Sequence, residues 1–360
     1  MPDRLCIYRP TWKGFTSLFQ HRSPAARHVQ YSQGKTRWVL AERPLVEPTD
    51  ATFRKETVPI PPSLADDEVL IRVDVISLEP AMRGWIRDVP SYVPPVPIGG
   101  VVRSFGVGEV VNGGKTLKVG DFVHGLLGWQ EYAVLKESAV QKVDIPPGGS
   151  LIDGFGATGM NALTAYFGIT AVGQLKPGET LVVSGAAGAT GLLAAAIGKI
   201  KGAGKVVGIA GGPDKVKFLK EEVGVDLAYD YKSAGWKEKF VEEVGLVDVF
   251  FDNVGGEILD FVLGRIRRFA RIIQCGSISA YNTTEPYGVK NYPQLTKFSA
   301  TWKGFIFSDY ASEFPAAKKE LAQWAAEGKL PRKFHIVDGG LDVLPKAFGY
   351  LFSGTNTGKT

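Results

Sequence analysis

The chain has 360 residues, enough for two domains with separate hydrophobic cores, and its 44% hydrophobic and 22% charged residues are ordinary for a globular protein. The formal net charge of +5 arises in residues 1–37, which hold seven Lys and Arg but one acidic residue; the other 35 basic and 36 acidic residues nearly cancel. A near-neutral body argues against a nucleic-acid-binding surface, and the absence of an apolar run of about 18 residues argues against a membrane-spanning helix.

The two cysteines, Cys6 and Cys275, lie far apart in the sequence, and the four histidines are scattered. This excludes a disulfide framework and argues against a zinc site, so we expect no bound metal and a reducing compartment, the cytoplasm. Residues 1–35 are rich in Arg and Ser, and we expect a flexible N-terminal extension there. A mitochondrial transit peptide is the alternative for this segment.

Residues 36–155 have the pattern of a compact, β-rich domain. Short runs of β-branched and apolar residues are separated by turns that are rich in Pro and Gly. The predicted strands include Arg37–Ala41, Glu68–Leu78, Val107–Val111 and Asp121–Val123.

Near Gly154 the pattern changes to strands that alternate with helices, up to about residue 325. The predicted strands are Thr180–Ser184, Lys205–Ala210, Leu227–Tyr229, Val247–Asp252 and Arg271–Cys275. The predicted helices are Gly159–Ile169, Gly188–Lys201, Lys215–Val223, Trp236–Glu243, Glu257–Leu263 and Phe314–Gly328. This alternation predicts an α/β fold with a doubly wound parallel sheet, and a short β-rich tail is expected after the last helix.

The clearest motif is the glycine-rich turn at Ser184–Gly191, which lies between a predicted strand and a helix of small residues. A dinucleotide pyrophosphate needs this setting, because small side chains let the backbone approach and the helix N-terminus offers N–H groups. The alternative is a tight turn that only packs a helix on a sheet. The motif lies inside a βαβ unit, which favours nucleotide binding.

The next predicted strand ends in Ala210-Gly211-Gly212, without the acidic residue that NAD-binding folds use to hold the ribose hydroxyls. Lys215 follows within one turn and would attract a 2′-phosphate. These two features favour NADP(H) as the cofactor. Asp214 remains open as a ribose ligand that would favour NAD instead, and a solvated surface charge remains open for Lys215.

Further motifs are Glu79–Gly84, Gly159–Gly168, Asp252–Gly256, Cys275–Asn282 and Gly354–Lys359. In this order, over about residues 37–360, they closely resemble the zinc-independent medium-chain dehydrogenases, the family of leukotriene B4 12-hydroxydehydrogenase/prostaglandin reductase, alkenal double-bond reductases and curcumin reductase. The resemblance implies a GroES-like catalytic domain over residues 36–155, completed by 326–360. It also implies a Rossmann NADP-binding domain over 156–325 and a homodimer.

The resemblance implies that Lys215 contacts the 2′-phosphate and that Tyr231 lies at the adenosine end of the cofactor. It places Asn253 and Gly255 beside the nicotinamide, and Asn356 against the cofactor. The full set of candidate cofactor-binding residues is Gly185, Ala187, Gly188, Ala189, Thr190, Gly191, Gly211, Lys215, Tyr231, Asn253, Gly255, Cys275 and Asn356.

The expected reaction is reduction of the C=C bond of an α,β-unsaturated ketone or aldehyde, with hydride transfer from NADPH to the β-carbon and no zinc. Tyr281 is the candidate catalytic residue, because a hydrogen-bond donor must stabilise the charge that develops on the carbonyl oxygen; an aromatic side chain that only packs is the alternative. Arg83 and Tyr92 are further substrate candidates, although Arg83 could instead brace a turn. The chain is thus expected to be an NADP-dependent oxidoreductase acting on CH–CH groups. A quinone reductase of the same superfamily and a non-catalytic NADPH-binding structural protein are the alternatives.

Overall fold

The computed structural model describes residues 34–143, 150–155 and 158–360. The predicted extension over residues 1–35 lies outside these ranges, apart from its last two residues. The described chain forms two compact units. The first contains residues 34–44, 48–143, 150–154 and 336–348, and the second contains 45–47, 155, 158–335 and 349–360. Every helix in these ranges is too short or too polar to cross a bilayer.

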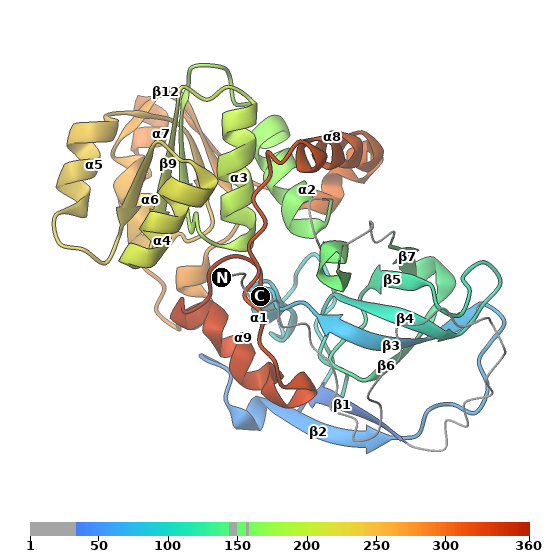
Figure 1. The fold of residues 1–360 in the computed structure, drawn as a ribbon. Coiled ribbons are helices and arrows are strands. Elements are labelled where there is room, and N and C mark those ends of the chain that lie inside the picture. The colour runs from blue at the N-terminus through green and yellow to red at the C-terminus, as the bar shows by residue number, and fades with distance from the viewer. Residues whose placement is uncertain (1–33, 144–149, 156–157) are drawn as a thin grey trace. The chain divides into compact units, whose positions relative to one another are not determined.

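The first unit is built from antiparallel strands. Strand β1 (Lys35–Leu40) pairs with β2 (Phe53–Val58), and five more strands form a sheet in the order β6-β3-β4-β5-β7 (Figure 1). These five are β3 (Glu68–Ile76), β4 (Gly106–Asn112), β5 (Phe122–Gly125), β6 (Tyr132–Lys136) and β7 (Val140–Lys142), and the short helix α1 (Met82–Trp85) follows β3. Val69, Ile71 and Val73 share one face of β3, because side chains alternate along a strand, and their burial makes that face part of the core.

The second unit contains a parallel sheet of six strands in the order β10-β9-β8-β11-β12-β13. The strands are β8 (Thr180–Ser184), β9 (Lys205–Ala210), β10 (Leu227–Asp230), β11 (Val247–Asp252), β12 (Ile266–Gln274) and β13 (Thr301–Gly304). The helices are α2 (Met160–Phe167), α3 (Ala189–Ile200), α4 (Pro213–Phe218), α5 (Trp236–Val244), α6 (Gly256–Leu263), α7 (Gln294–Lys297) and α8 (Phe314–Ala326).

Each central strand of this sheet is buried on both faces. On β8 and β11, Val183 and Phe251 belong to the hydrophobic cluster that includes residues of α2, α3 and α8, whereas Val182 and Phe250 belong to the cluster that includes residues of α5 and α6. Because neighbouring residues of a strand point to opposite faces, the two clusters cover the two sides of the sheet. The predicted fold class, a doubly wound Rossmann sheet with a β-rich second domain, is confirmed.

The predicted β-rich tail is wrong. Residues after α8 include the helix α9 (Leu344–Ser353), and the described strand pairing in this region is limited to two isolated bridges, Gly188 with Gly358 and Phe334 with Lys359. Four buried apolar side chains account for the helix: Leu344, Ala347, Phe348 and Leu351. Their spacing of three or four residues places them on one face of an α-helix and not on one face of a strand.

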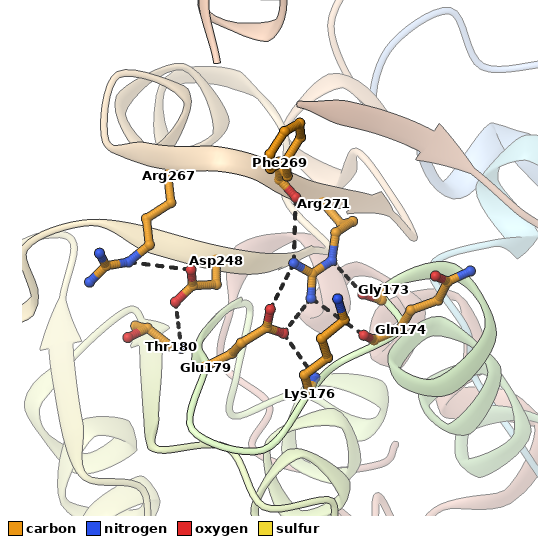
Figure 2. A network of polar contacts seen from close by, with 9 residues as sticks. All are labelled: Gly173, Gln174, Lys176, Glu179, Thr180, Asp248, Arg267, Phe269 and Arg271. Carbon is orange, nitrogen blue, oxygen red and sulfur yellow. Dashed lines mark hydrogen bonds and ion pairs between the residues drawn. The ribbon is translucent and has the colours of Figure 1, made fainter. Parts of the chain in front are cut away.

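A polar network joins strands β8, β11 and β12 at the edge where β8 begins (Figure 2). The guanidinium of Arg271 donates to both carboxylate oxygens of Glu179 and to the carbonyl of Gly173 at 2.8 Å, and Glu179 also accepts the Lys176 N–H at 2.8 Å. Burial raises the pKa of Glu179, but the bonds from Arg271 and Lys176 outweigh it and hold the pKa below its ordinary value. The network stabilises the sheet at the edge opposite the glycine-rich turn.

Candidate functional site

The turn after β8 brings backbone atoms to the carboxyl edge of the parallel sheet. Gly185 has a φ of +57°, which glycine adopts without strain, and its carbonyl accepts the Gly188 N–H at 3.0 Å. A Cβ on Gly191 would lie 2.2 Å from the Gly185 oxygen and 2.8 Å from the Ala186 Cα. Helix α3 can therefore begin against the turn only because residue 191 has no side chain. The first N–H groups of α3 lack acceptors within the helix and can bind an anion.

Thr190, in the first turn of α3, is held by a residue from the preceding helix. The side-chain amide of Asn161 on α2 donates to the Thr190 hydroxyl oxygen at 3.1 Å. Both residues are partly buried. This bond fixes the Thr190 side chain beside the candidate anion-binding N–H groups, so Asn161 positions the turn from the helix that precedes β8.

The loop after β11 is organised around one buried carboxylate. Asp252 accepts the Ser184 hydroxyl at 2.6 Å and the backbone N–H groups of Val254 and Gly255 at 3.0 Å. Asn253 binds back to Ser184, donating its backbone N–H to the hydroxyl at 2.9 Å and its side-chain amide to the carbonyl at 2.7 Å. Burial raises the pKa of Asp252, and the surrounding donors oppose the shift. The predicted residues Asn253 and Gly255 therefore lie beside the end of β8, where the glycine-rich turn begins.

The loop after β12 is attached to the same aspartate. The Cys275 N–H donates to the Asp252 carbonyl at 2.9 Å. Burial and the Asp252 charge raise the pKa of the Cys275 thiol to about 12, so the thiol is protonated at neutral pH. In the same loop, the Tyr281 hydroxyl accepts the Ser277 N–H at 3.2 Å. The structure thus brings Cys275 and Tyr281 to the same sheet edge as the turn.

The loops after β9 and β10 hold the residues predicted at the adenosine end. The Tyr231 ring lies against Gly211, where a Cβ would come within 2.8 Å of it. Lys215 on α4 is partly buried and donates to the Gly354 carbonyl at 2.7 Å. Asp214, the alternative ribose ligand, is exposed. Gly211, Lys215 and Tyr231 therefore gather around the ends of two neighbouring strands.

The C-terminal segment runs along the glycine-rich turn. The Gly358 N–H donates to the Ala187 carbonyl at 2.8 Å, and the Asn356 side-chain amide donates to the Gly358 carbonyl at 3.4 Å. A Cβ on Gly358 would lie 2.2 Å from the Lys333 carbonyl oxygen. The segment is thus held between the turn and residues 333–335, which places Asn356 two residues from a direct contact with the turn.

Two of the substrate candidates lie in the first unit. Arg83 exposes none of its surface and donates to the Pro44 carbonyl at 2.9 Å, and burial, with the nearby Arg87 charge, lowers its pKa to about 10. This interior position favours the alternative in which Arg83 braces a turn. Tyr92, in contrast, is 54% exposed, and its hydroxyl accepts the Trp85 indole N–H at 2.9 Å. Tyr92 can therefore meet a molecule from solvent.

Asn161, Ser184 and Asp252 lie within the motifs seen in the sequence but are not among the candidate site residues. Asp252 carries the one usable signal, a carboxylate that directly follows the apolar run Val249–Phe251, because a buried charge needs several donors. Ser184 and Asn161 give no such signal. Their contacts depend on pairs 68 and 29 residues apart in the sequence.

Two family models match the chain: the N-terminal domain of oxidoreductase matches residues 36–143, and zinc-binding dehydrogenase matches residues 189–323. YfmJ of Bacillus subtilis, provisionally named an NADP-dependent oxidoreductase, is 42% identical over 89% of this chain and 95% of its own. The NADPH-dependent curcumin reductase of Escherichia coli is 38% identical over 92% of this chain and 97% of its own. The chain belongs to the zinc-independent medium-chain dehydrogenase/reductases.

Among solved structures, that of CurA from Vibrio vulnificus in complex with NADPH is similar to the structure of this chain. It has a TM-score of 0.84 and 36% identity, and the match covers 90% of this chain and 97% of CurA. Membership confirms the resemblance seen in the sequence and makes the chain an enzyme of the oxidoreductase type. In the described parts of this medium-chain reductase, no group of three His, Cys, Asp or Glu side chains is arranged to hold a metal ion.

Proposed function

We propose that this medium-chain reductase uses NADPH to reduce the carbon–carbon double bond of α,β-unsaturated ketones or aldehydes. The observation that carries the proposal is the turn at residues 185–191, where the absence of a side chain on Gly191 lets helix α3 begin in direct contact with the Gly185 carbonyl. The cofactor is NADP(H), because β9 ends without an acidic residue and Lys215 lies beside that strand end. Curcumin is a conjugated enone, so the curcumin reductase among the relatives supports this substrate class.

In this proposal the N-terminus of α3 and the turn before it hold the pyrophosphate, and Lys215 with Tyr231 holds the 2′-phosphate end. Asn253 and Gly255 border the nicotinamide. The bound cofactor supplies the hydride that reaches the β-carbon of the substrate. The loops that Asp252 organises keep these backbone groups in fixed positions before the cofactor binds, which lowers the entropy cost of binding.

Tyr281 stabilises the negative charge that develops on the substrate oxygen. Its hydroxyl oxygen accepts the Ser277 N–H at 3.2 Å, and a phenolic hydroxyl that accepts one bond becomes a stronger donor in another. The proton that completes the reduced α-carbon then comes from solvent. The homodimer and the cytoplasmic location stay predictions.

The test is a panel of enones, enals and quinones, each followed by the loss of NADPH absorbance and repeated with NADH. Fast turnover of enones with NADPH is expected. Preferential turnover of quinones would favour the quinone reductase, and tight NADPH binding without turnover of any compound would favour a structural protein.

Loss of one oxyanion donor costs about 2.7–4 kcal/mol in barrier, so Tyr281→Phe is expected to lower kcat by about two to three orders of magnitude while NADPH affinity stays unchanged.

The matched control for Tyr281→Phe is Tyr292→Phe, because Tyr292 lies in the same unit and is 61% exposed. Its kcat is expected to equal that of the wild type. An unchanged kcat in Tyr281→Phe would remove Tyr281 from the mechanism but leave the reaction itself in place.

A further inference from the structure

The loops after β9 and β10 are joined through one carboxylate. Asp230, the last residue of β10, accepts the Gly212 N–H at 2.8 Å and the Lys232 N–H at 2.9 Å through the same oxygen. Gly212 follows β9, so these two bonds link the two loops across the neighbouring strands. The backbone of Lys232 is thus fixed relative to the loop that leads into α4 and Lys215.

Tyr231 fills the space between these loops. Its N–H donates to the Ala210 carbonyl at 3.0 Å, and its ring lies against Gly211 while staying 42% exposed. The Lys232 ammonium lies 5.9 Å from the centre of that ring. A cation at this distance from an aromatic face is attracted to it, which holds the Lys232 side chain close to Tyr231. We refer to Lys215, Tyr231 and Lys232 as the lysine corner.

The lysine corner holds two positive charges, and the nearby Asp230 carboxylate is bonded to the backbone N–H groups of Gly212 and Lys232. Lys215 and Lys232 take no part in any of the ion pairs seen across the described residues, although other lysines of the second unit do. Burial lowers the pKa of Lys215, and the positive charge of Lys232 lowers it further, so the two ammonium groups repel each other. A dianion placed between them would remove this repulsion.

We propose that Lys232 is a second cation for the 2′-phosphate of NADPH and acts together with Lys215. This inference rests on the proposed function, since it concerns the same cofactor. The ring of Tyr231 and the bonds of Asp230 bring Lys232 to the corner, and its exposed side chain can reach a phosphate oxygen. A nucleotide without the 2′-phosphate gains nothing from Lys232, so this residue contributes to the choice between NADPH and NADH.

The test compares Lys232→Gln with the wild type by calorimetry, using two fragments of the cofactor, adenosine 2′,5′-bisphosphate and adenosine 5′-monophosphate, as well as intact NADPH and NADH. The Kd for the two 2′-phosphorylated ligands is expected to rise by about two- to fivefold, the upper part of the range measured for one exposed ion pair. The Kd for the other two ligands is expected to stay the same. The wild-type preference is also expected to weaken at high salt, because salt screens exposed charges.

Lys239→Gln is the matched control, since it removes one exposed lysine from the same unit. It is expected to leave the Kd of all four ligands unchanged. Lys232→Arg keeps the charge and is expected to keep the wild-type preference. If the wild type binds neither NADPH nor NADH, the proposed function and this inference both fail. If the wild type prefers NADPH and Lys232→Gln retains the full preference, the inference alone fails.

Discussion

Replacing Gly191 with alanine tests the central physical claim, that α3 begins in direct contact with the turn. The added Cβ would lie 2.2 Å from the Gly185 carbonyl oxygen and 2.8 Å from the Ala186 Cα. Both neighbours are backbone atoms, so no side chain can rotate away, and the helix and the turn must separate by about 1 Å to reach an ordinary contact distance. Overpacking of this kind typically costs about 1–3 kcal/mol.

The same displacement moves the N–H groups that are proposed to bind the pyrophosphate. We therefore expect Gly191→Ala to lower both the urea midpoint of unfolding and the affinity for NADPH measured by calorimetry. Gly349→Ala is the control, because a Cβ there has no neighbour within 4 Å and lies in helix α9. Alanine in a helix interior is favoured over glycine by up to about 1 kcal/mol, so this variant should be as stable as the wild type or more stable. Wild-type stability and NADPH affinity in Gly191→Ala would refute the reasoning.

Two further predictions concern contacts within the second unit. Glu179→Gln is expected to destabilise the chain by about 1–3 kcal/mol, because the Arg271 guanidinium loses its charged partner; urea unfolding measures the loss, and an unchanged midpoint would contradict it. The folded-state pKa of Glu179 lies below its ordinary value of 4.5. The stability difference between the wild type and Glu179→Gln is therefore largest above pH 4.5 and decreases as the pH falls below that value. Asn161→Ala removes the bond to Thr190, which should cost about 1 kcal/mol of stability and also weaken NADPH binding; equal NADPH affinity would exclude Asn161 as a positioning residue.

The sequence predicts five of the six strands of the parallel sheet, because these strands contain apolar runs that are bounded by turns, but it does not predict the largely exposed strand β13 (Thr301–Gly304). Residues 180–184, 205–210 and 247–252 form strands with the predicted bounds. Strand β12 starts at Ile266, five residues before the predicted start at Arg271. The prediction starts too late because the first half of the strand contains three consecutive exposed residues, Arg267 to Phe269. A half-exposed strand of this composition does not show the apolar run on which the prediction depends.

The β-rich unit and the tail were predicted less well. The predicted strands do not include β2, β6 and β7. Strand β2 is largely polar and exposed, and β7 has only three residues, so neither shows an apolar run. The tail does not form the expected strands because its apolar residues Leu344, Ala347, Phe348 and Leu351 have helical spacing. Arg83 shows another limit, since a motif reveals that an arginine is present but not that it is fully buried.

For the candidate site, the sequence indicates which backbone turns meet at the sheet edge but not which side chains hold them there. The parallel order of β9, β8, β11 and β12 brings the loops at residues 185–191, 211–212, 253–255 and 275–281 to one edge. The sequence alone does not show the bonds between these loops, because Ser184 and Asp252 become neighbours only when β8 and β11 pair.

The bonds made by Asp252 have a consequence for motion. Through its carboxylate and its carbonyl, this residue holds the ends of three neighbouring strands, β8, β11 and β12. Opening any one of these loops breaks bonds that also hold another, so the three form one cooperative unit that opens together or not at all. We therefore expect the three loops to open together, and a ligand that orders one loop to slow the opening of all three.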